Sequence, residues 1–353
     1  MKILLAIIIT ATFSFGCAML EGEQTTTDSG GGGTTSAPTG GGDSTPTVAA
    51  DSSVTGQRIA AGSTFTCAIK SDSAVECWGE NMHTVVPSNL GTVRSISSGR
   101  GHTCAVKTDG TAQCWGGFDF SGSTVVPSTL GTVSSISAGY YHTCAVKTDG
   151  TAQCWGSDYS REGVSNYAGQ STVPADLGPV KSISAGLGHT CAIKSVLFSG
   201  ADNSVQCWGD NFYGQSTVPA DLGPVKSISA GSRHTCAVKT DGTAQCWGAN
   251  DGSYDDRGQS TVPSDLGTVS SISARQKHTC AVKTDGTAQC WGDNYYDIST
   301  IPSDLGVIEQ IVAGGESLGG PDEHFTCAIK ADDSVQCWGR MSHGQSTVPA
   351  DFQ

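Results

Sequence analysis

The sequence predicts an all-β protein: a seven-bladed β-propeller of four-stranded antiparallel blades, with one disulfide in each blade. Three observations support this prediction. The motif Cys-Trp-Gly accounts for all 7 tryptophans of the chain. Successive copies lie 37 to 53 residues apart, which is the repeat length of propeller blades. Each copy also contains four short runs typical of β-strands, separated by turn residues.

The composition excludes several classes of protein. The 353 residues carry a net charge of −14 and have a pI near 4.8, whereas nonspecific binding to nucleic acid needs a basic surface. Only 15% of the residues are charged and 47 are glycine, which also sets aside a helical bundle and a polytopic membrane protein. The 15 cysteines are too many for a cytosolic protein that uses no metal.

The chain begins with a segment typical of an export signal. Lys2 precedes an apolar run, residues 3–15, that is too short to span a bilayer but suits the core of a secretory signal. The following Gly16-Cys17 resembles the lipobox of bacterial lipoproteins, which implies lipidation of Cys17. The alternative is ordinary cleavage after Ala18. Because the other 14 cysteines form pairs, Cys17 is left over, and this favours the lipoprotein.

We therefore expect three regions. Residues 1–17 are a lipoprotein-like signal peptide, and residues 18–57 are a flexible tether rich in Gly, Ser and Thr. Residues 58–353 hold the repeats. This organisation predicts an exported, lipid-anchored protein at a bacterial outer membrane, on the cell surface or in the periplasm, with free secretion as the alternative.

The turn within each repeat determines how the cysteines pair. In residues 144–154, a three-residue loop with Gly150 in the left-handed conformation places Cys144 opposite Cys154, within disulfide range. Zinc is the rival use of paired cysteines, but nine intervening residues do not match the close spacing of structural zinc sites. The predicted disulfides are Cys67–Cys77, Cys104–Cys114, Cys144–Cys154, Cys191–Cys207, Cys236–Cys246, Cys280–Cys290 and Cys327–Cys337.

The repeat His-Thr-Cys-Ala-Val-Lys-Thr-Asp-Gly-Thr-Ala-Gln-Cys-Trp-Gly resembles that of the RCC1-like (regulator of chromosome condensation) superfamily, over residues 58–353. The resemblance implies a seven-bladed propeller, in a superfamily that also includes a secreted bacterial β-lactamase inhibitor protein. Both cysteine positions depart from the usual family pattern. The family name suggests guanine-nucleotide exchange, which we do not expect of an exported, disulfide-bonded, acidic chain.

The variable residues gather on one predicted face of the propeller. Loops that follow the first and third strands of each blade share this face, and the Thr-Asp-Gly hairpins lie on the other. Tyr and Arg are typical of binding hot spots; the alternative is that these loops vary without function and their tyrosines pack between blades. The predicted binding face comprises Arg100, Tyr140, Tyr141, Tyr159, Tyr167, Tyr213, Arg233, Tyr254, Arg257, Arg275, Tyr295 and Tyr296, accompanied by Phe118, Phe120, Arg161, Phe212 and Arg340.

The sequence contains no pattern that indicates catalysis or a cofactor. The histidine two positions before the first cysteine of five repeats is interpreted as structural, because Phe65 and Phe325 take its place in the first and last repeats. A metal-binding ring of histidines is the minor alternative. The stretch 251–256 lacks the ligand pattern of a calcium loop, and no nucleophile, zinc-hydrolase, phosphate or dinucleotide motif occurs. We expect no enzyme activity, no cofactor and no metal.

The function predicted from these observations is that of an extracytoplasmic protein-binding module, monomeric, whose Tyr/Arg-rich face binds an envelope or extracellular protein. Three alternatives stay open. Exposed tyrosines also stack on sugars, as in a carbohydrate-binding lectin. The propeller could inhibit a soluble enzyme, or serve as a structural surface protein without a dedicated ligand. Nucleic acid is not an expected partner, and contact with a membrane is expected only through the N-terminal lipid.

Overall fold

The computed structural model describes residues 56–117, 121–158, 168–195, 202–250, 252, 256–316 and 323–353. They belong to one compact unit, Ser53–Gln353. No helix in these ranges is long and apolar enough to cross a membrane. The strands are β1 (Ile59–Ala61), β2 (Phe65–Ile69), β3 (Val75–Gly79), β4 (Val93–Ser98), β5 (His102–Lys107), β6 (Ala112–Gly116), β7 (Val133–Ala138), β8 (His142–Lys147), β9 (Ala152–Gly156), β10 (Val180–Ala185), β11 (His189–Lys194), β12 (Val205–Gly209), β13 (Val225–Ala230), β14 (His234–Lys239), β15 (Ala244–Gly248), β16 (Val269–Ala274), β17 (His278–Lys283), β18 (Ala288–Gly292), β19 (Ile308–Glu316), β20 (Glu323–Lys330) and β21 (Val335–Gly339). The described residues also form three short helices, α1 (Asn81–Thr84), η1 (Tyr295–Asp297) and η2 (Ala350–Phe352).

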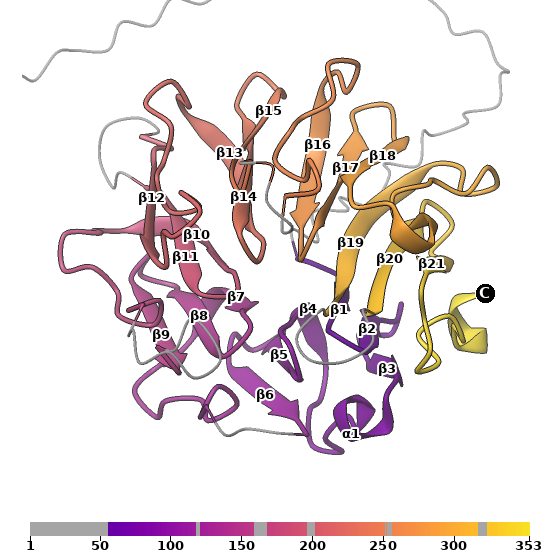
Figure 1. Ribbon diagram of the computed structural model, residues 1–353. Helices are drawn as coiled ribbons and strands as arrows, with labels where there is room; N and C mark the ends of the chain where they lie inside the picture. The colour runs from indigo at the N-terminus through magenta and orange to yellow at the C-terminus, as the bar shows by residue number, and fades with distance from the viewer. Residues whose placement is uncertain are drawn as a thin grey trace, which may run out of the picture. The chain divides into compact units, whose positions relative to one another are not determined.

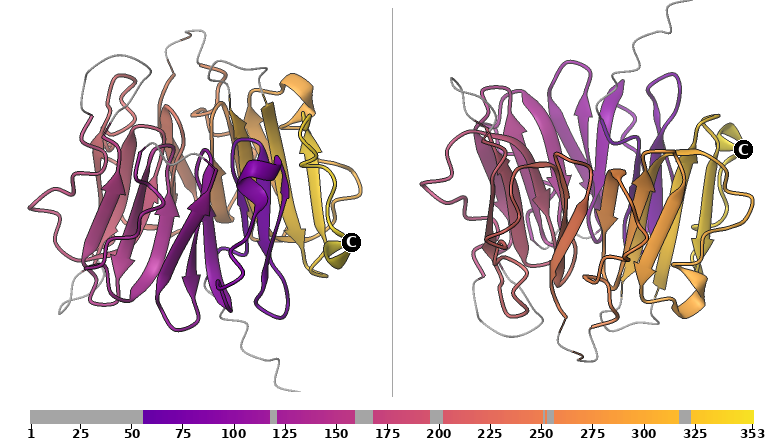
Figure 2. Two further views of the ribbon diagram at one scale, coloured as in Figure 1. Left: turned by 90° about the horizontal axis from the view of Figure 1, so that it is seen from below. Right: turned by 90° about the horizontal axis from the view of Figure 1, so that it is seen from above.

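Successive groups of three strands form seven antiparallel sheets, which we number as blades 1 to 7 in chain order. The blades stand around a ring with their first strands innermost (Figure 1). Each first strand neighbours the first strands of the two adjacent blades, and β1 neighbours β19, which closes the ring. Figure 2 shows the ring edge-on, with the strands running between its two faces. The predicted seven-bladed all-β architecture is confirmed.

Each blade has three strands rather than the four we predicted. The expected fourth run, such as residues 215–222, pairs with no strand; it turns on itself, with the Leu222 N–H donating to the Pro219 carbonyl oxygen (3.1 Å). Proline has no N–H for a sheet ladder. The Gln215 carbonyl oxygen instead accepts hydrogen bonds from Trp247 Nε1 and Thr235 Oγ1 of the next blade, each at 2.9 Å. The run therefore links neighbouring blades.

The hairpins and disulfides agree with the prediction. Cys144 lies opposite Cys154, and Gly150 adopts a φ of 85° in a turn closed by a hydrogen bond from the Lys147 N–H to the Thr151 carbonyl oxygen (2.8 Å). Every blade contains one disulfide between its second and third strands, with Cα atoms 4.0 or 4.1 Å apart. The disulfides are Cys67–Cys77, Cys104–Cys114, Cys144–Cys154, Cys191–Cys207, Cys236–Cys246, Cys280–Cys290 and Cys327–Cys337.

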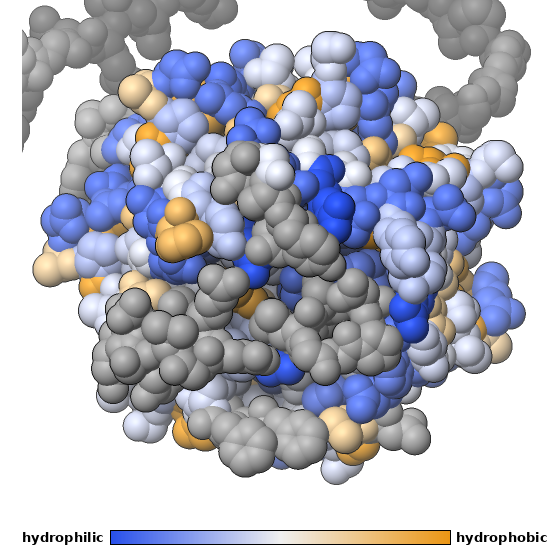
Figure 3. Space-filling view, in the orientation of Figure 1, coloured by the Kyte–Doolittle hydropathy of each residue, from blue (hydrophilic) through white to orange (hydrophobic). Residues whose placement is uncertain are grey.

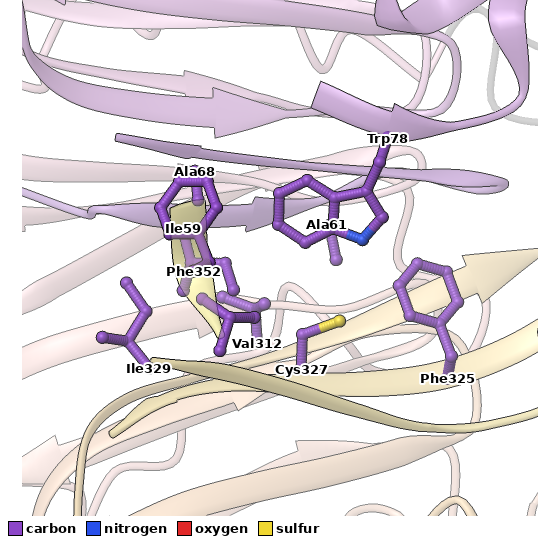
Figure 4. Close-up of a cluster of buried hydrophobic side chains, with 10 residues drawn as sticks. Ile59, Ala61, Ala68, Trp78, Val312, Phe325, Cys327, Ile329 and Phe352 are labelled. Atoms are coloured by element: carbon purple, nitrogen blue, oxygen red, sulfur yellow. The ribbon is translucent and has the colours of Figure 1, made fainter. Parts of the chain in front are cut away.

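The hydrophobic core lies between the blades, because each narrow sheet buries its faces against its neighbours. Where blade 7 meets blade 1, Ile59 and Trp78 face Val312 and Ile329 (Figure 4). The C-terminal Phe352 completes this cluster, with its ring centroid 5.7 Å from that of Trp78. No sheet combines strands from both ends of the described chain. The ring is closed by this packing, by a backbone hydrogen bond from the Gly315 N–H to the Gly62 carbonyl oxygen (3.0 Å), and by ion pairs of Arg58 with Glu309 and Asp333.

Candidate binding face

The two faces of the ring differ in their loops. We call the side formed by the loops after the first and third strands the loop face, and the side formed by the turns between the second and third strands the hairpin face. The loop face carries Arg100, Tyr140, Tyr141, Tyr213, Arg233, Arg257, Arg275, Tyr295, Tyr296 and Arg340. Tyr159, Tyr167, Tyr254, Arg161, Phe118, Phe120 and Cys17 lie outside the described residues.

The base of the loop face is held by backbone hydrogen bonds between neighbouring blades. The Tyr140 N–H donates to the Gly186 carbonyl oxygen (3.0 Å), and the Leu187 N–H donates to that of Gly231 (3.2 Å). At Gly186 this close approach leaves no room for a side chain, because a Cβ there would lie 2.4 Å from the Gly231 carbonyl oxygen. The residues that directly follow the first strands thus form a hydrogen-bonded rim at the base of the loops.

Blade 6 has Arg275 where the other blades have glycine at this rim position. Its guanidinium reaches across the ring to blade 2, where Nη2 donates to the Gly99 carbonyl oxygen (2.9 Å) and Nη1 donates to that of Ser98 (3.3 Å). Blades 2 and 6 are not adjacent. Arg275 thus fixes the position of two distant parts of the loop face.

Three arginines of the loop face stack on tyrosines, each across a junction between adjacent blades. The Arg100 guanidinium carbon lies 5.2 Å from the ring centroid of Tyr140 and 5.6 Å from that of Tyr141, and Arg100 Nη1 donates to the Tyr141 hydroxyl (2.9 Å). The other two pairs are Arg233–Tyr213 at 5.0 Å and Arg340–Tyr296 at 4.7 Å. Arg340 Nε also lies 3.7 Å from the buried Glu323 carboxylate. These contacts hold the side chains of the three arginines in fixed positions on the face.

The predicted residues differ in exposure. Tyr140 is only 5% exposed, so its ring packs at a junction between blades rather than being presented to solvent. Tyr295 is 65% exposed and Arg257 is also exposed. Figure 3, which views the molecule as in Figure 1, shows a mainly hydrophilic surface with scattered apolar residues. The exposed aromatic rings are therefore local features on a polar background.

Two loops of this face share one construction, and we call residues 210–214 and 293–297 the aromatic loops. Each reads Asp-Asn followed by two aromatic residues. Asp210 Oδ1 accepts a hydrogen bond from the Phe212 N–H (3.0 Å), and Asp293 Oδ1 accepts one from the Tyr295 N–H (3.2 Å). The supporting roles of Asp210 and Asp293 were missed by our sequence analysis, although the repeated Asp-Asn-aromatic-aromatic pattern could have revealed them.

The repeated histidines form buried links between blades. His142 Nε2 lies 2.8 Å from Thr190 Oγ1, and that hydroxyl donates to the Gln170 carbonyl oxygen (2.9 Å). Because the threonine hydroxyl donates its proton to the carbonyl oxygen, His142 must donate from Nε2. A neutral His142 ring therefore has no proton on Nδ1. The same histidine-to-threonine contact joins His102 to Thr143, His189 to Thr235, His234 to Thr279 and His278 to Thr326.

Burial strongly lowers the pKa of these histidine rings. Burial, followed by the proximity of His189 and His102, lowers the pKa of His142 from 6.5 to about 3. Burial likewise lowers the pKa of His189 to about 4. Among the described residues, no group of three or more His, Cys, Asp or Glu side chains is arranged to hold a metal ion. The histidines act as neutral hydrogen-bond donors that join one blade to the next.

Comparison with known proteins identifies the repeat. Residues 93–121, 133–162, 225–259, 269–297 and 322–345 match the regulator of chromosome condensation (RCC1) repeat. A search of curated protein sequences found no match. The chain thus carries RCC1 repeats, and the match supports its assignment to the RCC1-like superfamily.

Solved structures show the same fold. The ectodomain of the Physcomitrella patens receptor kinase CR4 is 25% identical, with a TM-score of 0.62 over 80% of this chain and 73% of that one. The CRINKLY WD40 ectodomain of the Arabidopsis thaliana receptor kinase ACR4 is 23% identical, with a TM-score of 0.59 over 80% and 97%. Yeast RCC1 (Prp20), in a structure with Kap60, is 16% identical, with a TM-score of 0.58 over 79% of each chain.

Proposed function

We propose that this chain is an exported protein-binding module and that its loop face is the recognition surface. The observation that carries the proposal is the contrast between the faces. Four of the seven turns of the hairpin face share the sequence Lys-Thr-Asp-Gly (residues 107–110, 147–150, 239–242 and 283–286), whereas the loop face differs from blade to blade and holds the described tyrosines and most of the arginines. Tyr and Arg supply large contact area together with hydrogen bonds, and they dominate binding hot spots.

The ordered side chains of the loop face support this role. Arg100, Arg233 and Arg340 are already stacked on tyrosines, so a partner would immobilise few additional rotamers, and association would cost less entropy. The receptor-kinase ectodomains that share the fold favour an exported binding domain over a cytosolic exchange factor. Seven disulfides favour an oxidising compartment in the same way.

The proposal includes a lipid anchor. A diacylated Cys17 followed by the Gly/Ser/Thr-rich residues 18–57 would hold the propeller at a membrane surface while leaving the loop face free to bind. Mass spectrometry of the membrane fraction tests this part on its own. The wild-type N-terminus should carry a lipid on Cys17, and Cys17→Ser should release the protein into the soluble fraction.

Affinity capture tests protein binding. Full-length oxidised protein is immobilised and exposed to extract of the native envelope, and retained proteins are identified by mass spectrometry. A loop-face variant carries Tyr213→Ala, Arg257→Ala and Tyr296→Ala. A matched hairpin-face variant carries Lys147→Ala, Lys239→Ala and Lys283→Ala.

We expect one protein to be retained by the wild type and the hairpin-face variant but lost with the loop-face variant. If the retained protein is lost with the hairpin-face variant instead, recognition belongs to the hairpin face and the proposal is contradicted. If no protein is enriched, protein binding is contradicted, and a glycan ligand or a structural role takes precedence.

A further inference from the structure

In both aromatic loops, an arginine of the same chain stacks on the second ring. Arg233 stacks on Tyr213 and Arg340 stacks on Tyr296, with guanidinium carbons 5.0 and 4.7 Å from the ring centroids. The first ring of each pair meets the second edge-on, at centroid distances of 4.9 Å in blade 4 and 4.3 Å in blade 6. Two blades thus repeat one unit of exposed ring, supporting ring and stacked guanidinium.

The first ring of each unit is presented to solvent. Phe212 is 78% exposed and Tyr295 is 65% exposed, so neither ring contributes much buried area to the fold. Within the described residues, no Lys or Arg stacks on either ring. The hydrogen bonds that Asp210 and Asp293 accept from the Phe212 and Tyr295 N–H groups nevertheless fix the backbone that carries these rings. In these loops, hydrogen bonds hold an exposed ring in a fixed position, which is typical of a binding element.

Each unit contains a carboxylate, Asp210 or Asp293, and also the guanidinium of Arg233 or Arg340, which is already stacked on the second ring. The preference for a cationic ligand therefore rests on the free faces of the exposed rings and on the acidic charge of the whole chain. The negative face of an aromatic ring attracts Lys and Arg side chains, and an adjacent carboxylate adds to the attraction. Asp210 and Asp293 each place a carboxylate two residues before the exposed ring, and the loop of blade 6 also contains Asp297. The whole chain carries a net charge of −14, which attracts basic partners over a distance and repels acidic ones.

We propose that Phe212 and Tyr295 are two equivalent platforms for Lys or Arg side chains of a basic polypeptide partner. The inference rests on the proposed function, in which the loop face binds a protein, and it adds the chemistry of that protein. Because the same unit occurs in blades 4 and 6, a segment with several basic residues has two places to bind. The chain's own Arg233 and Arg340 show the same contact on the second rings.

Octalysine peptide is the probe, and titration calorimetry with full-length oxidised protein at 150 mM NaCl is the measurement. Phe212→Ala and Tyr295→Ala should each weaken binding about three- to fivefold, and the double variant about tenfold or more. These substitutions change no charge, so a loss reports on the rings. Phe212→Tyr and Tyr295→Phe keep an aromatic face and should bind within about twofold of the wild type.

Two controls separate the platforms from general attraction to an acidic surface. Asp149→Asn with Asp285→Asn removes two charges from the hairpin face and should weaken octalysine binding less than the double ring variant does. Circular dichroism should show equal melting temperatures for all ring variants, because the rings are exposed.

The inference is overturned if the double ring variant binds octalysine as tightly as the wild type, or if the wild type does not bind octalysine at all. In either case, a partner captured through Tyr213, Arg257 and Tyr296 would leave the proposed function standing. Failure of that capture together with ring-dependent octalysine binding would reject the envelope-protein assignment and keep the cation platforms.

Discussion

The Arg275 guanidinium nitrogen Nη2 lies 2.9 Å from the Gly99 carbonyl oxygen, although 176 residues separate them in the chain. This hydrogen bond crosses the ring from blade 6 to blade 2, in addition to the contacts that join each blade to its neighbours. It is charge-assisted and partly buried, so it should contribute more than a neutral surface hydrogen bond. Arg275 therefore contributes to the rigidity of the loop face.

Arg275→Ala should lower the free energy of unfolding by about 1–3 kcal/mol, because two hydrogen bonds to backbone carbonyls are lost. Denaturant titration measures the change. Arg275→Lys keeps the charge but has a single nitrogen that cannot match the two-pronged contact, so it should fall between the wild type and Arg275→Ala. Equal stability of all three proteins would show that the contact does not hold the blades.

Asp297 stands where the corresponding loop of blade 4 has Gly214. The φ of Asp297 is 59° and that of Tyr296 is 67°, both in the left-handed region, while Gly214 has a φ of 77°. Asp297→Gly should therefore raise the free energy of unfolding by about 1 kcal/mol, since glycine adopts this conformation without a Cβ clash. Asp297→Ala removes the same charge but keeps the Cβ, so it should give no such gain. A similar gain for both variants would attribute the effect to charge instead of strain.

The buried histidines should make the fold sensitive to acid. Burial lowers the pKa of His234 and His278 to about 3 and that of His189 to about 4, whereas the unfolded chain takes up protons near pH 6.5. Between these values the unfolded state binds more protons, so stability should fall as the pH drops from about 6.5 toward 4. The slope should approach about 1.4 kcal/mol per pH unit for each histidine.

The natural control is phenylalanine, because Phe65 and Phe325 occupy the same position in blades 1 and 7. His234→Phe should reduce the dependence of unfolding free energy on pH by about one proton, measured by urea titration at pH 7, 6 and 5. An unchanged slope would mean that His234 does not remain neutral in the folded state.

The sequence predicted the local structure of the blades better than their contacts. The Cys144–Cys154 register followed from a turn of three residues, and the structure has the same register. The prediction of a fourth strand was wrong because a short β-like run containing Pro219 resembles an edge strand, while the hydrogen-bonding partner of this run, Trp247, belongs to the next blade.

The arrangement of the loop face was only partly predictable for the same physical reason. The alternation of loops assigned Tyr140 and Tyr295 to one face, but their exposures, 5% and 65%, depend on what the adjacent blade places beside them. The Arg275–Gly99 contact joins residues in non-adjacent blades. A repeat pattern identifies which residues are equivalent, whereas contacts across the ring arise at positions where one repeat departs from the others.

The segment that ends at Phe352 helps to close the ring. Phe352 is 5% exposed and packs against Trp78, whose Nε1 donates to the Gln345 carbonyl oxygen (2.8 Å). Phe352→Ala should lower the free energy of unfolding by about 3–5 kcal/mol, the usual range for a buried phenylalanine, with Phe352→Leu retaining most of it. Thermal unfolding measures both. Asp351→Asn removes an exposed ion pair with Lys70 in the same segment and should leave the melting temperature nearly unchanged. If Asp351→Asn were as damaging as Phe352→Ala, the ion pair with Lys70 rather than the packing of Phe352 would hold the C-terminal segment in place.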